Sequence, residues 1–237
     1  MTVAETTAAA EVVDLASTPL RDLNQRLHDL VHDPTAPRRW RVLNPNGAHA
    51  VACGVDAEIE VDIEGHVGYY CAGMNKLATV RVHGNAGPGL AENLMSGTVI
   101  VEGNASQSAG ATAHGGLLVV RGDAAARCGI SMKGVDIVVG GSVGHLSGFM
   151  AQAGRLVVCG DAGEALGDSI YEARLYVRGT VAGLGADCVE KELEDEHRME
   201  LADLLARAGI EADAGEFRRY GSARRLYNFH VDNAGAY

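Results

Sequence analysis

The residues best suited to metal binding or nucleophilic catalysis in this chain are nine histidines and five cysteines. The cysteines are odd in number and include no C-x-x-C pair; they are Cys53, Cys71, Cys128, Cys159 and Cys188. Such spacing is typical of reduced thiols rather than of a disulfide framework or a zinc site. The four histidines inside the repeat described below, His66, His83, His114 and His145, fall at different positions of it, so they cannot line up as a ligand set. We therefore predict no metal site.

The common catalytic and phosphate-binding signatures are also missing from the sequence. No G-x-S-x-G turn and no local Cys–His signature occurs, so nucleophilic catalysis is not indicated. No G-x-x-x-x-G-K-[ST] loop occurs, and no G-x-G-x-x-G opens a helix. Carboxylates such as Glu164 and Asp168 lie near each other, but we interpret them as solvated residues at turns. The sequence predicts no catalytic and no cofactor-binding residue.

The composition indicates a folded chain rich in small residues. Its 237 residues include 31 glycines, and 47% are hydrophobic but only 5% aromatic. A net charge of −11 argues against nucleic acid as a partner. The sequence contains no run of about 18 apolar residues that would span a membrane. Residues 1–5 lack the basic start of a secretory signal, so we expect a cytoplasmic protein.

A 19-residue repeat organises the middle of the chain. Aliphatic residues stand two and four positions before a recurring glycine, and a small residue follows seven positions after it. A fixed period of about 20 residues is typical of solenoids, in which each unit buries its apolar face by stacking on its neighbours. The repeat glycines follow one another without insertion and are Gly65, Gly84, Gly103, Gly122, Gly141, Gly160 and Gly179.

For residues 61–188 we predict an all-β solenoid, a single-stranded β-helix of about seven 19-residue coils. Short β-branched runs end at each repeat glycine, and 19 residues with several glycines leave no room for two helices. A leucine-rich repeat fits less well, because no Asn ladder follows a Leu-x-Leu strand. We expect the glycines to lie at corners, where they would supply a positive φ and let successive backbones approach.

The segments on either side should cap the coils, because an uncovered terminal coil exposes unpaired backbone groups. We expect a flexible N-terminus over 1–17, and an N-terminal helix with a lead-in over 18–60, with Thr18 as the helix N-cap. A C-terminal helix is predicted over 189–209, because residues 187–190 resemble a capping box.

The last segment, 210–237, is an aromatic and basic tail. Tyrosine and arginine are frequent anchors of protein interfaces. We predict an interface arm, and the alternative is a tail packed along its own solenoid. The arm residues are Phe217, Arg218, Tyr220, Arg224, Tyr227, Phe229 and Tyr237. Methionines nine to eleven positions after the repeat glycines either form a second binding strip or fill the core; they are Met74, Met95, Met132 and Met150.

The glycine spacing resembles that of a known family. Residues 141–148 and 160–167 both follow G-x-x-G-x-x-x-G, the pattern of the C-terminal β-helix domain of the glutamate synthase large subunit. That domain is similar to the β-helix subunit of formylmethanofuran dehydrogenase. Other coils depart from the pattern, since Ser106, Ala125 and Ala182 replace the middle glycine. The resemblance implies a right-handed β-helix.

Longer strings resemble the stand-alone β-helix subunits of the N-methylglutamate synthase family. These strings are residues 40–45, 65–75, 128–134, 167–174 and 227–237. The resemblance implies a non-catalytic scaffold between two partners, a class II glutamine-amidotransferase-like subunit and a glutamate-synthase-like subunit that carries FMN and an iron–sulfur cluster. The implied complex, a higher hetero-oligomer, makes N-methylglutamate and ammonia from glutamate and methylamine.

Two other functions stay open. A β-helix subunit of a formylmethanofuran dehydrogenase, or of a formyltransferase/hydrolase-type complex, would share the solenoid but have other partners. An independent β-helix enzyme acting on a polysaccharide would need a groove of aromatic and acidic residues. The coils offer few aromatic residues for it, namely Tyr69, Tyr70, Phe149, Tyr171 and Tyr176.

Overall fold

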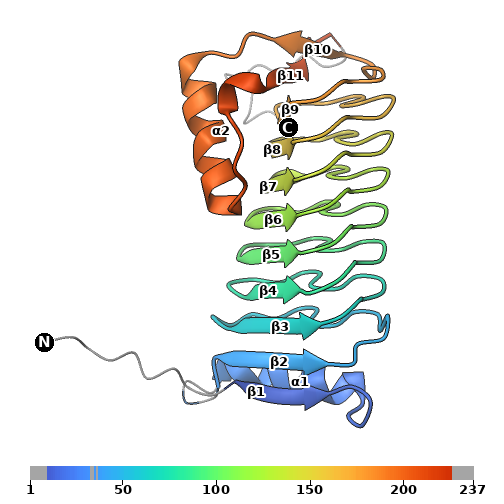
Figure 1. The fold of residues 1–237 in the computed structure, drawn as a ribbon, viewed down its shortest axis with the longest axis vertical. Coiled ribbons are helices and arrows are strands. Elements are labelled where there is room, and N and C mark those ends of the chain that lie inside the picture. The colour runs from blue at the N-terminus through green and yellow to red at the C-terminus, as the bar shows by residue number, and fades with distance from the viewer. Residues whose placement is uncertain (1–9, 33–34, 36, 226–237) are drawn as a thin grey trace, which may run out of the picture.

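The repeated segment folds into a stack of coils (Figure 1). A computed structural model describes residues 10–32, 35 and 37–225. Among these residues, eleven strands form one sheet in the order β1-β2-β3-β4-β5-β6-β7-β8-β9-β11-β10. The prediction of an all-β solenoid with coils of about 19 residues is confirmed. The parallel strands are β1 (Glu11–Asp14), β2 (Arg39–Leu43), β3 (Glu60–Glu64), β4 (Thr79–Val82), β5 (Thr98–Val101), β6 (Leu117–Val120), β7 (Lys133–Val139), β8 (Ala153–Val158) and β9 (Arg174–Val177).

From β3 to β9, consecutive strands pair with an offset of 19 residues, apart from a register shift at Lys133 in β7, which pairs with Ala153. Val80 pairs with Val99, and Val99 pairs with Leu118. In β4 and β5 the second and fourth residues are buried, whereas the first and third are half-buried. The side chains of Val80, Val99, Leu118 and Ile137 are 0% exposed and stack inside the coils. The aliphatic positions before each repeat glycine therefore form the core, as their period of two predicts.

A second column of contacts joins the coils just after the repeat glycines. Single-residue bridges connect the residues two positions after each glycine, and the column comprises Val67, Ala86, Ala105, Ala124, Val143, Ala162 and Val181. Between the strand and the next coil, most of the remaining chain is turn. Each coil is thus held by its strand, by this bridge and by backbone hydrogen bonds such as Gly110 N–H to the Leu90 carbonyl at 2.8 Å.

The repeat glycines are needed for space more than for a positive φ. Of these seven glycines, all within the described chain, Gly65 alone has a positive φ, at 135°. A Cβ on Gly84 would lie 2.6 Å from the carbonyl carbon of Gly65 in the coil before. Positive φ belongs instead to the small residues seven positions later, such as Ala72 at 54° and Gly129 at 67°. The prediction of close approach is confirmed, but that of a positive φ at the repeat glycine is wrong.

A polar ladder, which was not predicted from the sequence, joins the coils at the residue after each repeat glycine. Each side chain in this column accepts a hydrogen bond from the backbone N–H of the same column one coil later, at 2.7 to 3.0 Å. The ladder supplies an acceptor for an N–H group that would otherwise face solvent at the corner. Its accepting residues are His66, Asn85, Asn104, Asp123, Ser142 and Asp161.

The N-terminal end is closed by helix α1 (Leu20–Asp29), followed by a 3-10 turn η1 (Leu30–His32). Leu23 and Leu27 of α1 are fully buried against the first coil. The side chain of Asn24 fixes the helix to that coil, because it donates to the Ala50 carbonyl at 2.8 Å and accepts from Ala52 N–H at 3.0 Å. This arrangement supplies the expected N-terminal cap.

Two details of the N-terminal prediction are wrong. Residues 11–14, within the segment expected to be flexible, form β1, which pairs in parallel with β2. The residue at the helix N-cap is Pro19, and no side-chain cap bond is made, so Thr18 does not cap the helix. β1 pairs with residues about 30 positions later in the chain. The four residues of β1 contain no local pattern that predicts this pairing.

The C-terminal end contains β10 (Cys188–Lys191), α2 (Asp195–Ala208), a 3-10 turn η2 (Ala214–Glu216) and β11 (Arg218–Ser222). β11 lies between β9 and β10 and runs antiparallel to both. The predicted helix over 189–209 therefore begins too early, because Cys188–Lys191 pairs with β11 instead. The helix N-cap is Glu194, which forms a capping box with His197, and the helix ends at Gly209 as expected.

Within the described part of the chain, no helix combines the length and the apolar character that crossing a membrane requires.

Candidate functional site

Helix α2 covers the outer face of the sheet over strands β6 to β9 (Figure 1). Several outward-facing residues of these strands are apolar and meet the apolar side of the helix. Val138 and Val157 are 0% exposed there, as are Leu201 and Leu204 of α2. Residues on the same face of β3 are charged, as in Glu60-Val61-Asp62-Ile63-Glu64, and no helix lies on them. The helix therefore ends where the apolar outer face ends.

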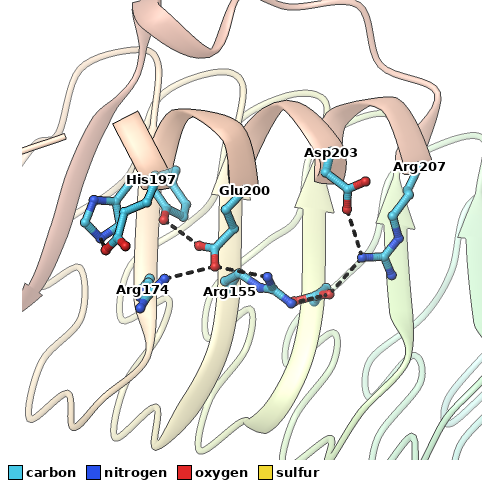
Figure 2. Close-up of polar contacts among 9 residues, drawn as sticks. Arg155, Arg174, His197, Glu200, Asp203 and Arg207 are labelled. Carbon is cyan, nitrogen blue, oxygen red and sulfur yellow. Dashed lines mark hydrogen bonds and ion pairs between the residues drawn. The ribbon is translucent and has the colours of Figure 1, made fainter. Parts of the chain in front are cut away.

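An ion-pair cluster fastens one edge of α2 to the sheet (Figure 2). We use this name for Asp136, Arg155, Arg174, Glu200 and Arg207. Arg155 donates two hydrogen bonds to the Asp136 carboxylate, at 2.6 and 2.9 Å. Glu200 of α2 lies 2.9 Å from Arg174 and 3.1 Å from Arg155, and Arg207 lies 3.4 Å from Asp136. Glu200 of the helix thus pairs with two arginines of the sheet, and Arg207 of the helix pairs with an aspartate of the sheet.

The cluster shifts the pKa of the groups at its centre. Partial burial acts to raise the pKa of Glu200, but the hydrogen bond from the Tyr176 hydroxyl, at 2.7 Å, and the charges of Arg174 and Arg155 outweigh it, so this pKa is lowered. Burial and the same hydrogen bond raise the pKa of Tyr176. Glu200 is therefore ionised and Tyr176 neutral at physiological pH.

A pH dependence of stability follows from the lowered pKa of Glu200. Because the folded-state pKa lies below the unfolded value, the contribution of Glu200 is present above the unfolded pKa and is lost as pH falls through the folded one. We expect Glu200→Gln to lower the free energy of unfolding by about 1–2 kcal/mol at pH 7, where an ionised acceptor is replaced by a neutral amide. Urea unfolding of both proteins at pH 7 and at pH 3 should show the difference shrinking in acid. A difference that grows in acid would contradict this assignment.

A basic pocket of about 310 Å³ lies beside the cluster at the C-terminal end of the stack. We call it the cap pocket. Four of its lining residues are cationic and one, Glu172, is acidic. A second hollow, of about 330 Å³, adjoins it and shares Glu172 and Arg174. The cap pocket is lined by Tyr171, Glu172, Ala173, Arg174, Lys191, Arg219, Gly221, Ser222 and Arg224.

The predicted interface arm divides into residues used within the chain and residues at its surface. Phe217 and Tyr220 are 3% and 2% exposed and belong to the chain's own core, as in the alternative of a tail packed along its own solenoid. Arg218 donates to the Gly179 carbonyl at 2.9 Å, and Arg224 pairs with Glu172 at 2.8 Å beside the cap pocket. Partner contacts of the two arginines stay a prediction. The remaining arm residues, Tyr227, Phe229 and Tyr237, lie outside the described residues.

The methionine positions are also divided. Met132 is fully buried, so it fills the core, whereas Met74, Met95 and Met150 are exposed. Tyr70 is exposed near Met74, and the two line a small apolar hollow of about 110 Å³ with Cys53 and Glu92 among its other walls. Core filling is therefore correct for Met132, and binding by the three exposed methionines stays a prediction.

The cysteines have the properties of structural thiols. All five lie in the described part of the chain and are free. Burial raises the pKa of Cys71 and that of Cys128 to about 12. A nucleophilic cysteine needs a thiolate, which these two groups do not form at neutral pH.

One group of three side chains in the described chain could in principle hold a metal ion, namely Glu194, Glu196 and His197, whose ligand atoms lie within 4.8 Å of one another. His197, however, is 4% exposed and its Nδ1 accepts the Glu194 N–H at 3.3 Å. This is the capping box that starts α2, so we interpret the group as a helix cap.

Taken together, the stacked coils and their two different caps define a β-solenoid protein in which an ion-pair cluster joins the C-terminal helix to the sheet. The chain is 61% identical over 227 residues to protein GlxC of Rhizobium meliloti (strain 1021), an alignment that covers 95% of this chain and 99% of that relative. The chain therefore belongs to the GlxC family. No family model matches the chain.

Proposed function

We propose that this chain is a non-catalytic scaffold subunit of a multi-subunit glutamate-synthase-like enzyme, N-methylglutamate synthase being the specific candidate. FMN and an iron–sulfur cluster would be carried by a partner subunit, and a class II glutamine-amidotransferase-like subunit would be the second partner. The proposal rests on the resemblance of the coil sequences to that family.

The observation that carries the non-catalytic part of the proposal is that the clustered charged groups pair with one another and the buried thiols stay protonated. Four carboxylates and arginines of the ion-pair cluster, Asp136, Arg155, Arg174 and Glu200, neutralise one another across the junction of α2 with the sheet. Buried thiols such as Cys128 are protonated. A continuous sheet with in-register strands is a stiff support, so the coils are well suited to hold other chains in fixed relation.

The test is purification of the tagged chain from its native cell, compared with the same chain expressed alone. We expect the native preparation to contain an amidotransferase-like chain and a flavin-coloured chain, and to convert glutamate and methylamine. The chain expressed alone should be colourless and inactive with glutamine, glutamate or methylamine. Turnover by the isolated chain would refute the scaffold proposal. Partners that transfer formyl groups would replace it with the formylmethanofuran dehydrogenase alternative, and activity on a polysaccharide would replace it with an independent β-helix enzyme.

A further inference from the structure

Two cations of the cap pocket are placed directly opposite each other by the sheet. Lys191 of β10 and Arg219 of β11 are cross-strand partners in the antiparallel pair, so both side chains leave the same face. Gly221, two residues along β11, is on that face as well and adds no side chain. An added Cβ there would find the Cγ of Lys191 as its nearest neighbour, at 3.8 Å. The space above Gly221 is therefore part of the pocket.

Like charges in directly opposite positions of two strands repel each other and destabilise the pair. The other two cations of the cap pocket have carboxylate partners, as Arg174 has in Glu200 and Arg224 in Glu172. The side-chain ammonium of Lys191, which lines the pocket, forms no hydrogen bond and no ion pair with any described residue. Arg219 donates its Nε–H to the Glu192 carbonyl at 2.8 Å, which orients the guanidinium and leaves its two terminal amino groups for a ligand.

We propose that the cap pocket binds a carboxylate between Lys191 and Arg219. A carboxylate accepts two parallel hydrogen bonds from a guanidinium and also neutralises an ammonium group. The cap pocket concentrates positive charge within a chain of net charge −11, so it attracts anions locally. Its volume of about 310 Å³ is at the lower end of the range for small-molecule sites. The ligand is a small free carboxylate or an acidic side chain of a bound protein, and the chemistry is the same for both.

The test is calorimetric titration of the full-length chain, at low ionic strength, with succinate in one arm and a blocked tetraglutamate peptide in the other. We expect one saturable site per chain. Lys191→Gln should weaken binding about tenfold, as the loss of a charged hydrogen bond does. Gly221→Leu should abolish binding by filling the pocket while both positive charges are kept. Thermal unfolding of each variant should show that the fold is kept.

The matched control is Lys76→Gln, which removes one positive charge from the other end of the stack, where Lys76 pairs with Asp56 at 2.9 Å. Binding by this variant should equal that of the parent chain. Succinate binding at least as tight as the peptide assigns the site to a free carboxylate, and much tighter peptide binding assigns it to a protein side chain. Absence of saturable binding in both arms, or equal losses in Lys191→Gln and Lys76→Gln, would overturn the proposal.

Discussion

Gly141→Val is expected to lower the free energy of unfolding by about 3 kcal/mol, the upper end for overpacked sites. A Cβ at Gly141 would lie 2.2 Å from Oδ1 of Asp123 and 2.9 Å from the carbonyl oxygen of Gly122. The Asp123 oxygen is also the polar-ladder acceptor for Ser142 N–H, at 2.7 Å. The substitution therefore forces two coils apart and removes a ladder bond at the same place. Urea unfolding followed by circular dichroism measures the loss.

The control for this prediction is Gly221→Val. That glycine also lies in the sheet region, but an added Cβ would have no neighbour closer than 3.8 Å, and its φ is not positive. Valine also favours strands. We expect a change within about 0.5 kcal/mol, as for substitutions without a clash. Equal unfolding midpoints for the two variants would show that coil spacing does not exclude a side chain at Gly141.

Asp136→Ala is the second substitution with a large expected effect. The Asp136 side chain is 8% exposed and contacts both Arg155 and Arg207. Its removal leaves two guanidinium groups facing each other at the α2 junction. Removing one partner of a well-buried ion pair costs about 3–5 kcal/mol, and because Arg155 is 31% exposed we expect about 2–3 kcal/mol. Loss of the helix contact should also make α2 more susceptible to limited proteolysis.

Asp203→Ala is the matched comparison, because Asp203 pairs with the same Arg207, at 3.6 Å, but its side chain is 67% exposed. Exposed ion pairs contribute about 0–1 kcal/mol, so this variant should unfold nearly like the parent chain. Similar losses in both aspartate variants would mean that burial does not set the strength of the ion-pair cluster.

The coils could be predicted from the sequence because the repeat constrains them many times over. A constant period places Val80, Val99 and Leu118 in one column whatever the details of each turn. The ends have no such repetition. β10 at Cys188–Lys191 is a strand only because β11 pairs with it, and the intervening chain includes a whole helix. Pairing over such a distance leaves no local pattern, and the short run at 187–190 resembles a helix start.

The candidate site was predicted less well, for two physical reasons. A segment rich in aromatic residues has the same composition whether it packs on its own chain or on a partner chain. The presence of Phe217 and Tyr220 therefore did not indicate which of these surfaces they cover. Part of the ion-pair cluster follows from the repeat. Asp136, Arg155 and Arg174 are spaced by 19 residues and therefore lie in one column, in which an acidic residue is followed by two basic ones. Glu200, however, joins them only after α2 has folded back on the sheet.

The constant offset between strands determines how the length of the stack would change with the number of coils. Because β4 to β9 pair at the same 19-residue spacing, deleting or duplicating one whole coil would leave every other pairing unchanged. Each such event would move α1 relative to the β10–β11 closure by ~4.8 Å, the distance between neighbouring strands. Family members that differ by whole coils in the part of the stack that α2 does not cover would therefore hold their two termini at separations that change in discrete increments, without altering either terminal structure.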